Sequence, residues 1–409
     1  MLGWLQQFST FCFLDNQEYA VAPHHYECLI GAGVARSVQG EDMDKLDAFL
    51  AKKSWVFGHL AYSLSGSLHR FSTTKNDKIG FQPYFFFSPQ VVLEINGNSV
   101  SVHAQNPTVI FEQIYKVVIS EGAPVLSIAT TPVLAKDEYI KKIHSLQSHI
   151  HRGDCYEINF CQEIFAEDVA FDPTTAYQKL AAISPNPFSA FYRINNNYLL
   201  CASPERFLAK KDQTIFSQPI KGTIKRNLAD TLEDDQLREE LRTSSKDQSE
   251  NVMVVDLVRN DLTRICKEAS VKVEELFGIY SYPQVHQMIS TIRGELKEAV
   301  SFSEIIKATF PMGSMTGAPK HRVMQLIEEY EPSARGIFSG AVGYVNPAGD
   351  FDFNVVIRSI MYNESTRYLS YQVGSAITFY SDAEREWEEC LLKAKAIKTV
   401  LEEGVTNGG

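Results

Sequence analysis

Short apolar segments separated by turn residues dominate the first 130 positions of the chain. Residues 55–62 and 81–95 are examples, and each is rich in aromatic and β-branched side chains. Short runs of this kind, bounded by turn residues, are typical of β-strands. The pattern therefore predicts a β-rich region over residues 1–130.

The periodicity changes at Lys136, where apolar residues begin to recur at spacings of three and four positions. This spacing continues to Ile150, and Gly153 follows it. An amphipathic helix that ends near a glycine has this pattern. We therefore predict a boundary near residue 130 and a second domain over 131–403, with both regions in one compact unit. Residues 404–409 are predicted to be a frayed tail.

Strands and helices are predicted in groups along the second region. The predicted strands are 156–165, 188–194, 198–209, 214–223, 285–296 and 351–360, and the predicted helices are 174–183, 231–265, 302–309, 319–330 and 384–403. A strict alternation of strand and helix would favour a parallel, doubly wound sheet, whereas grouping favours antiparallel pairing. The sequence therefore predicts an α+β fold built on antiparallel sheet.

Composition and charge exclude several classes of function. The 409 residues are 44% hydrophobic and carry a formal net charge of −11, so nucleic acid and anionic membranes are disfavoured as partners. Seven scattered cysteines form no C-x-x-C pair, which fits a reducing cytoplasm. The first residues lack a basic segment, and no window approaches the ~18 apolar residues of a membrane span. A cytoplasmic protein is therefore expected.

Lys221 and Glu205 are the first candidates for chemistry. Lys221 lies between Pro219 and Gly222, which hold its backbone and leave room beside it. If burial or a nearby cation lowers its pKa, this lysine becomes a nucleophile or a base. Glu205 precedes it by sixteen residues, a separation that a β-hairpin can bring together, and its carboxyl group can serve as an acid. A solvated lysine and an ordinary cross-strand ion pair are the alternatives.

Three glutamates are candidate ligands for a metal ion. Glu250 opens a predicted helix, and Glu386 and Glu389 lie one turn apart on one face of the last predicted helix. A site with few carboxylates, which leaves room for water and substrate oxygens, suits Mg²⁺. Helical glutamates are usually solvated, however, and spacing alone gives no reason to pair the two helices.

The segment 313–320 is a glycine-rich loop that leads into a helix. Pro319 suits the first helical turn, so free backbone N–H groups there could hold a carboxylate or a phosphate. The loop is not a P-loop, because Lys320 falls three residues after Gly317 and is followed by His321. A kinase or ATPase is therefore disfavoured, and a tight turn that caps a helix is the alternative.

Arg358 and His286 are candidates on predicted strands. Arg358 ends the predicted strand 351–360, where alternation places it on the face of Asn354 and Asp352. Its guanidinium can bind a carboxylate with two parallel hydrogen bonds. His286 could orient a substrate or act as a base, although a lone histidine on a strand is more often packed in the core.

The order and wording of these segments resemble the chorismate-utilising enzymes, a family that includes anthranilate synthase component I, aminodeoxychorismate synthase component I, and the isochorismate and salicylate synthases. The resemblance covers about residues 130–400. It is carried by the segments GDCYEINFCQ, SPERF, PIKGT, ENVMVVDLVRNDLTR, VHQMIS, GSMTGAPKHR, GAVGY, FNVVIRS and EWEECLLKAKA. The family's fold, antiparallel β-sheets packed together with helices on the outside, is therefore expected here.

Within this family, the third residue of P-I-x-G-T separates the branches. Alanine is typical of anthranilate synthases, whereas lysine, here Lys221, is typical of bacterial aminodeoxychorismate synthases. The resemblance implies that Lys221 attacks the chorismate ring while Glu205 protonates the departing 4-hydroxyl group. Ammonia then displaces the lysine and gives 4-amino-4-deoxychorismate. His286 is implied to lie along the ring.

The resemblance also implies a cofactor and a set of substrate ligands. Glu250 and Glu389, with Glu386 beside them, are implied to hold Mg²⁺, which neutralises the ring carboxylate and helps to lower the pKa of Lys221. Arg358 is implied to grip the enolpyruvyl carboxylate together with backbone N–H groups. The other residues expected at the substrate are Tyr344, Gly374, Ala376, Ile377, Ser314, Lys320 and Thr223.

A partner and several alternatives follow from the same resemblance. The chain has no G-x-C-x-G segment that could supply a glutaminase cysteine, so a glutamine amidotransferase subunit is expected to provide ammonia, in p-aminobenzoate and folate biosynthesis. Anthranilate synthase and isochorismate or salicylate synthase are the close alternatives. A regulatory subunit without catalytic activity is an alternative of another class. Retention of Lys221, Glu205, Glu250 and Glu389 argues against it.

Overall fold

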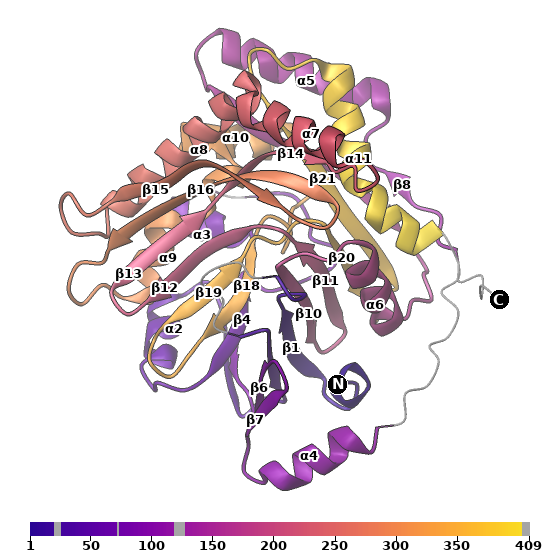
Figure 1. Cartoon of the computed structure of the whole chain (residues 1–409), viewed down its shortest axis with the longest axis vertical. Coiled ribbons are helices and arrows are strands. Elements are labelled where there is room, and N and C mark those ends of the chain that lie inside the picture. Colours follow the sequence, from indigo (N-terminus) through magenta and orange to yellow (C-terminus); the bar gives the residue numbers. More distant parts are fainter. Residues whose placement is uncertain (20–25, 72, 118–126, 403–409) are drawn as a thin grey trace.

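Two antiparallel β-sheets make up the body of the molecule. The computed structural model describes residues 1–19, 26–71, 73–117 and 127–402, and the predicted frayed tail 404–409 lies outside them. Within these residues the sheets have 11 and 10 strands, with helices around them (Figure 1). The predicted α+β fold of packed antiparallel sheets with outer helices is confirmed.

The first sheet combines strands from both ends of the chain. In spatial order it contains β17 (Gly317–Ala318), β9 (Glu157–Ala166), β21 (Tyr368–Ile377), β20 (Ser359–Asn363), β11 (Asn197–Ser203), β10 (Phe188–Ile194), β1 (Thr10–Asp15), β2 (Cys28–Ala32), β6 (Val91–Asn96) and β7 (Ser99–His103), and β8 (Thr131–Pro132) pairs with β9. The N-terminal region thus continues a sheet whose other half carries the later motifs.

The second sheet is assembled in the same way. It contains β14 (Ile220–Lys225), β16 (Val285–Glu295), β13 (Thr214–Gln218), β12 (Arg206–Lys211), β19 (Phe351–Asn354), β18 (Ala341–Val345), β4 (Val56–Leu60), β5 (Tyr84–Ser88) and β3 (Arg36–Gly40), and β15 (Lys272–Ser281) pairs with β16. A large hydrophobic cluster contains residues of both sheets, such as Cys12 and Leu199 from the first and Phe57 and Phe86 from the second. Burial of these side chains holds the two sheets together.

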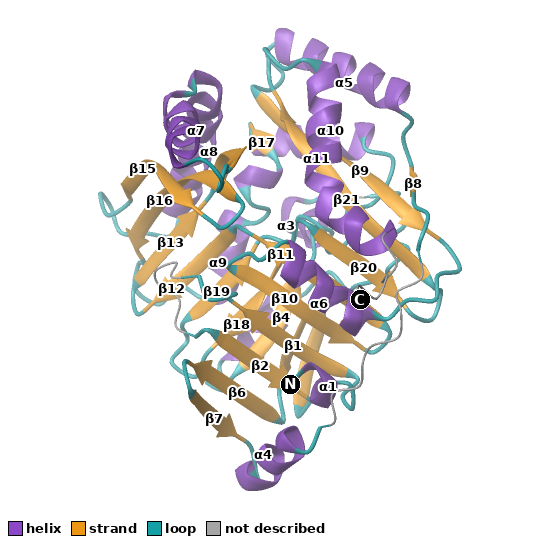
Figure 2. Cartoon of the chain, turned by 45° about the vertical axis from the view of Figure 1, so that its right-hand side comes forward, coloured by secondary structure: helices purple, strands orange, loops and turns teal. Residues whose placement is uncertain are grey.

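Helices surround the two sheets. The helices are α1 (Leu2–Leu5), α2 (Met43–Leu50), α3 (Leu64–His69), α4 (Pro107–Tyr115), α5 (Lys136–His151), α6 (Pro173–Ile183), α7 (Thr231–Thr243), α8 (Ser245–Thr263), α9 (Phe302–Thr309), α10 (Lys320–Tyr330) and α11 (Ala383–Glu402). Figure 2 shows α7 and α8 beside β15 and β16, and α5, α10 and α11 beside β9 and β21. Apolar faces of α5, α6, α10 and α11 cover the first sheet in a second cluster.

Several predicted elements are confirmed with small shifts, and four are divided. The predicted helices at 136–150, 174–183 and 302–309 match α5, α6 and α9. The predicted helix 231–265 is two helices, because Ser244 caps α8 and its extended backbone ends α7. The predicted strand 214–223 is interrupted at Pro219, which lies between β13 and β14.

The predicted strands 198–209 and 351–360 are wrong as single strands. Each contains two strands that belong to different sheets, β11 and β12 in one case and β19 and β20 in the other. The prediction that Arg358 lies on a strand is corrected as well, since it lies between β19 and β20 with φ +51°. Strands buried on both faces read as continuous apolar runs, so their hydrophobicity hides the point at which the chain changes sheet.

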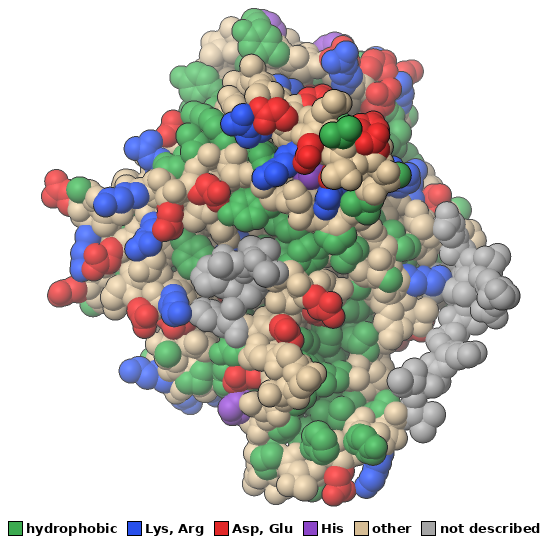
Figure 3. Space-filling model, in the orientation of Figure 1, with side chains coloured by type: hydrophobic (Ala, Val, Ile, Leu, Met, Phe, Trp, Pro, Cys, Tyr) green, Lys and Arg blue, Asp and Glu red, His purple; other side chains and the backbone are tan. Residues whose placement is uncertain are grey.

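Three further observations concern surface charge, helix length and the cysteines. Acidic and basic side chains are interspersed on the face that Figure 3 shows. None of the helices in the described ranges combines the length and hydrophobicity that crossing a bilayer requires. All seven cysteines are buried and unpaired by disulfides.

Candidate active site

Glu205 and Arg358 lie where the chain passes from one sheet to the other. Glu205 connects β11 to β12, and Arg358 connects β19 to β20. Because β11 pairs with β20 and β12 pairs with β19, the two connections run side by side. The backbone N–H of Val355 donates to the Glu205 carbonyl at 3.0 Å, and that of Ala202 donates to the Arg358 carbonyl at 3.3 Å.

The Glu205 carboxyl group is buried and has a raised pKa. Its residue is 5% exposed, and burial raises the pKa of Glu205 to about 7. A hydrogen bond with the Ser314 side chain, the charge of Lys221, the backbone N–H of Ile220 and the charge of Arg358 all act in the opposite direction. A carboxyl group with such a pKa stays partly protonated at neutral pH, as a general acid must.

Lys221 lies in β14 and is held by an acidic neighbour. Its Nζ donates to Oε1 of Glu157 at 2.6 Å, and both side chains are buried. Burial lowers the pKa of Lys221, but the charges of Glu157, Glu250 and Glu205 together raise it above its ordinary value. In the protein without a metal ion, the surrounding carboxylates outweigh desolvation, so burial alone does not bring the pKa of Lys221 below its ordinary value.

Sequence reasoning missed Glu157, which lies in β9. The available signal was an acidic residue at the start of a predicted strand that is mostly apolar. A charge that is buried in such a strand needs a partner. The partner itself, 64 positions away along the chain, could not be identified without the pairing of the strands around it.

Gly222 explains how Lys221 comes close to α8. Its φ is +88°, a conformation that glycine adopts without strain, and a Cβ there would meet the side chain of Asp247 at 3.0 Å. Asp247 lies in the first turn of α8, one turn before Glu250. The glycine thus permits the close approach that places the charge of Lys221 beside that of Glu250.

The candidate metal ligands Glu250 and Glu386 face each other from α8 and α11. Lys246 Nζ lies 3.9 Å from Glu250 Oε1 and 3.8 Å from Glu386 Oε1. The ammonium group of Lys246 therefore bridges the two helices. Oε1 of Glu250 and Oε2 of Glu386 are buried and accept no hydrogen bond within the described residues. Carboxylate oxygens of this kind fit Mg²⁺. No group of three or more histidine, cysteine or acidic side chains in the described ranges is already gathered as a metal site.

Glu389 lies one turn beyond Glu386 and is held by Lys393. The two side chains form an ion pair at 2.7 Å. Burial raises the pKa of Glu389, but the charges of Lys393, Lys246 and Lys221 lower it below its ordinary value overall. On α8, burial outweighs the charges of the nearby lysines and raises the pKa of Glu250 to about 7.

Backbone groups of β21 border the same region. Gly374, Ala376 and Ile377 pair with β9 on one side, whereas β20 pairs only with residues 368–371 of this strand. The opposite edge of β21 therefore extends beyond β20, and its polar backbone groups are not used by that strand. The Gly374 carbonyl accepts a hydrogen bond from Lys393 at 2.9 Å.

Two candidates from the resemblance lie close to the lysine and the acid. The Ser314 side chain forms a hydrogen bond with the Glu205 carboxyl group. The Ser314 backbone carbonyl accepts a hydrogen bond from the Asn159 side chain at 3.1 Å. Thr223 follows Lys221 in β14 and is exposed. Pairing of β14 with β16 fixes its position opposite Gln287.

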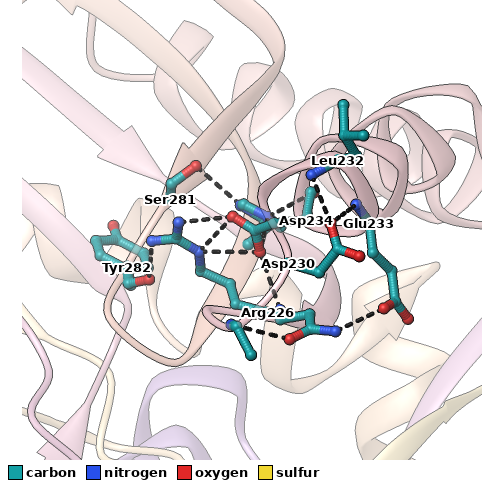
Figure 4. A network of polar contacts seen from close by, with 10 residues as sticks. Arg226, Asp230, Leu232, Glu233, Asp234, Ser281 and Tyr282 are labelled. Carbon is teal, nitrogen blue, oxygen red and sulfur yellow. Dashed lines mark hydrogen bonds and ion pairs between the residues drawn. The ribbon is translucent and has the colours of Figure 1, made fainter.

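His286 is engaged in a polar network between β16 and α7. Its Nδ1 lies 2.8 Å from Ser281 Oγ, and its Nε2 lies 3.2 Å from Asp234 Oδ1. Arg226 forms an ion pair with Asp234 at 2.6 Å, and Figure 4 shows these side chains converging. Both ring nitrogens of His286 thus have protein partners in this structure.

Tyr344 lines another pocket than Glu205 and Ser314, whereas Lys320 contacts Asp261, which lines the same pocket as Glu205 and Ser314. Tyr344 contacts the rings of Tyr26 and Trp55 and lines a pocket together with Asp352, whereas Glu205 and Ser314 line a different pocket. Lys320 forms an ion pair with Asp261 and so ties α10 to α8.

Comparison with known proteins identifies the family. Residues 14–399 match the family model described as chorismate binding enzyme. The chain is 42% identical over 272 residues to the probable chloroplastic aminodeoxychorismate synthase of Oryza sativa subsp. japonica, and 37% identical over 293 residues to aminodeoxychorismate synthase component 1 of Salmonella typhimurium. These alignments cover 66% and 70% of this chain, but only 30% and 64% of the two relatives.

The fold is shared with a solved structure of lower sequence identity. Anthranilate synthase component I from Streptococcus pneumoniae superposes with a TM-score of 0.81 at 22% identity, and the alignment covers 93% of each chain. Since the family model also extends from β1 into α11 and includes Glu205, Lys221 and the acidic residues of α8 and α11, the chain belongs to the chorismate binding enzyme family.

Proposed function

We propose that this protein aminates chorismate at C4 with ammonia and so produces 4-amino-4-deoxychorismate. The observation that carries the proposal is the buried arrangement of Lys221 and Glu205, whose charges interact at the junction of the two sheets. The curated relatives named aminodeoxychorismate synthase support this choice of product. A lysine in P-I-K-G-T also distinguishes the chain from the anthranilate synthase pattern.

The proposed reaction divides one difficult displacement into two. Hydroxide is a poor leaving group, so Glu205 donates a proton to the departing 4-oxygen as the Lys221 nitrogen forms a bond to the ring. Ammonia then attacks the ring, and the bond to Lys221 breaks. Arg358, beside Glu205, and the free edge of β21 supply donors for the carboxylates of the substrate.

Glu250, Glu386 and Glu389 would hold Mg²⁺, which supplies positive charge to neutralise a substrate carboxylate. One buried carboxylate oxygen of Glu250 and one of Glu386 accept no hydrogen bond within the described residues, which supports this assignment. A glutamine amidotransferase subunit is proposed as the source of ammonia, since the bacterial relative is named component 1. The product would enter p-aminobenzoate and folate biosynthesis in the cytoplasm.

The test is incubation of the purified chain with chorismate, Mg²⁺ and ammonium at mildly alkaline pH, with products resolved by mass. Wild type is expected to form aminodeoxychorismate, and Lys221→Ala is expected to lose this product or form another. Lys225→Ala, which changes an exposed lysine of the same strand, is the matched control and should keep the activity. Anthranilate or isochorismate as the wild-type product would place the chain in another branch of the family.

A further inference from the structure

Glu157 contacts Lys221 but has no role in the reaction proposed above. The residue is 2% exposed, and its Oε1 lies 2.6 Å from Lys221 Nζ. In β9, Glu157 lies opposite Ala318 of β17, and the next residue, Ile158, lies opposite Ile377 of β21. This strand pairing fixes the backbone from which the Glu157 side chain reaches the lysine.

The lysine needs a proton acceptor before it can act. An ammonium group has no free electron pair, so Lys221 must lose a proton to form a bond to carbon. The charged groups that face it are Glu157 on β9, Glu205 at the sheet crossover, Glu250 on α8 and Glu389 on α11. These four carboxylates favour the protonated lysine, so the proton has to pass to a defined acceptor during the reaction.

Of the four carboxylates, Glu157 is the suitable acceptor. Glu205 is the proposed proton donor to the leaving oxygen and cannot accept a proton in the same step. Glu250 lies 3.9 Å from Lys246, and Glu389 is paired with Lys393. Glu157 receives the side-chain hydrogen bond that Lys221 donates, so transfer along that bond requires no rearrangement.

We propose that Glu157 is the general base that takes a proton from Lys221 as the lysine attacks the ring. This inference depends on the proposed function. One N–H bond of the ammonium breaks and its proton goes to Oε1 of Glu157. The freed electron pair forms the C–N bond, and the C–O bond breaks as Glu205 protonates the oxygen, which leaves as water. When ammonia displaces the lysine, the proton returns from Glu157 to the Nζ nitrogen.

The test compares Glu157→Gln with wild type in steady-state turnover of chorismate and ammonium across a range of pH. Glutamine keeps the volume and an oxygen acceptor for Lys221 but cannot accept a proton at that oxygen. We expect turnover at neutral pH to fall by ~100-fold or more, the usual contribution of a general base. We also expect turnover of the variant, divided by that of wild type at the same pH, to rise by about tenfold per pH unit while Lys221 stays protonated, because solvent then removes the proton.

The matched control is Glu163→Gln on the same strand. The Glu163 carboxylate accepts a hydrogen bond from the Tyr368 hydroxyl at 3.0 Å and has no proposed role, so this variant should retain activity. Glu157→Asp should recover part of the lost turnover, because it restores a carboxylate at a longer distance. Substrate affinity should change little in either Glu157 variant.

The outcomes separate the two proposals. If Glu157→Gln keeps turnover within about threefold of wild type while Lys221→Ala is inactive, the role of Glu157 is refuted and the proposed function stands. A deficit of Glu157→Gln that stays constant across pH would show a merely structural contact and would also refute it. If Lys221→Ala keeps wild-type turnover, the covalent route fails, and the inference about Glu157 fails with it.

Discussion

A buried carboxyl group such as Glu205 affects stability as well as chemistry. Burial raises the pKa of Glu205 from 4.5 to about 7. Below pH 4.5 the group is protonated in the folded and the unfolded chain. As pH rises from 4.5 to 7, the unfolded chain ionises first, so folding loses stability, and above pH 7 the loss is complete. The retained acid is therefore a cost to the fold at neutral and alkaline pH.

We expect Glu205→Gln to stabilise the protein at pH 8 and to leave its stability unchanged at pH 4. The gain at pH 8 should be on the order of 3 kcal/mol, because each pKa unit corresponds to about 1.4 kcal/mol. Denaturant unfolding at both pH values measures it. Turnover should fall at least ~100-fold, because the amide cannot protonate the leaving oxygen. A variant that is inactive and equally unstable at both pH values would contradict the assigned environment.

At the scale of single elements, a substitution of Gly222 tests whether the close approach of β14 to α8 positions Lys221. Alanine at φ +88° is strained by about 1–2 kcal/mol, and its Cβ would also press on Asp247 in α8. We expect Gly222→Ala to lose stability by about this amount and to lose most of its turnover, since β14 must shift and carry Lys221 with it. Thermal unfolding and product formation give the two readouts.

The control for this change is Gly349→Ala. Gly349 lies in the turn between β18 and β19 with φ +85°, and a Cβ there meets no atom within 4 Å. It should lose similar stability through strain alone and keep full turnover. Equal activity of the two variants would show that the approach of β14 to α8 does not position the lysine.

Hydrophobic periodicity could not predict the sheet crossovers that carry Glu205 and Arg358. Apolar alternation and turn residues were sufficient for α5, α6 and β10. They failed at Glu205 and Arg358, where an apolar run continues although the chain leaves one sheet and enters the other. Hydrophobicity reports burial and not the partner strand, so a crossover between two buried strands leaves no periodic signal.

The residue identities of the motifs, in contrast, were informative where hydrophobic periodicity gave no signal. They singled out Lys221, Glu205 and Glu250, whose charges interact in the structure. They gave no role to Glu157, and their placement of Tyr344 at the substrate stays a prediction for a ring that packs with Tyr26 and Trp55. Contacts between positions far apart in the chain depend on strand pairing, which a single sequence does not specify.

At the scale of the whole molecule, the first 130 residues are built into both sheets. β1 pairs with β10 in the first sheet, and β4 pairs with β18 in the second. Phe57 and Phe86, from this part of the chain, are fully buried in the cluster between the sheets. Without these strands, the edges of β10 and β18 and the apolar surface between the sheets would be exposed to water.

We therefore expect the fragment 131–402 to fail to fold alone. It should show no cooperative thermal transition and should bind the dye ANS, since its sheets would have uncovered apolar faces. Co-expression with residues 1–130 should restore a cooperative transition, because the missing strands can pair with β10 and β18 without a covalent link. A cooperative, active fragment would instead mean that the two regions are separate folding units. That outcome would contradict the sheet order described above, in which β1 and β4 pair with strands from later in the chain.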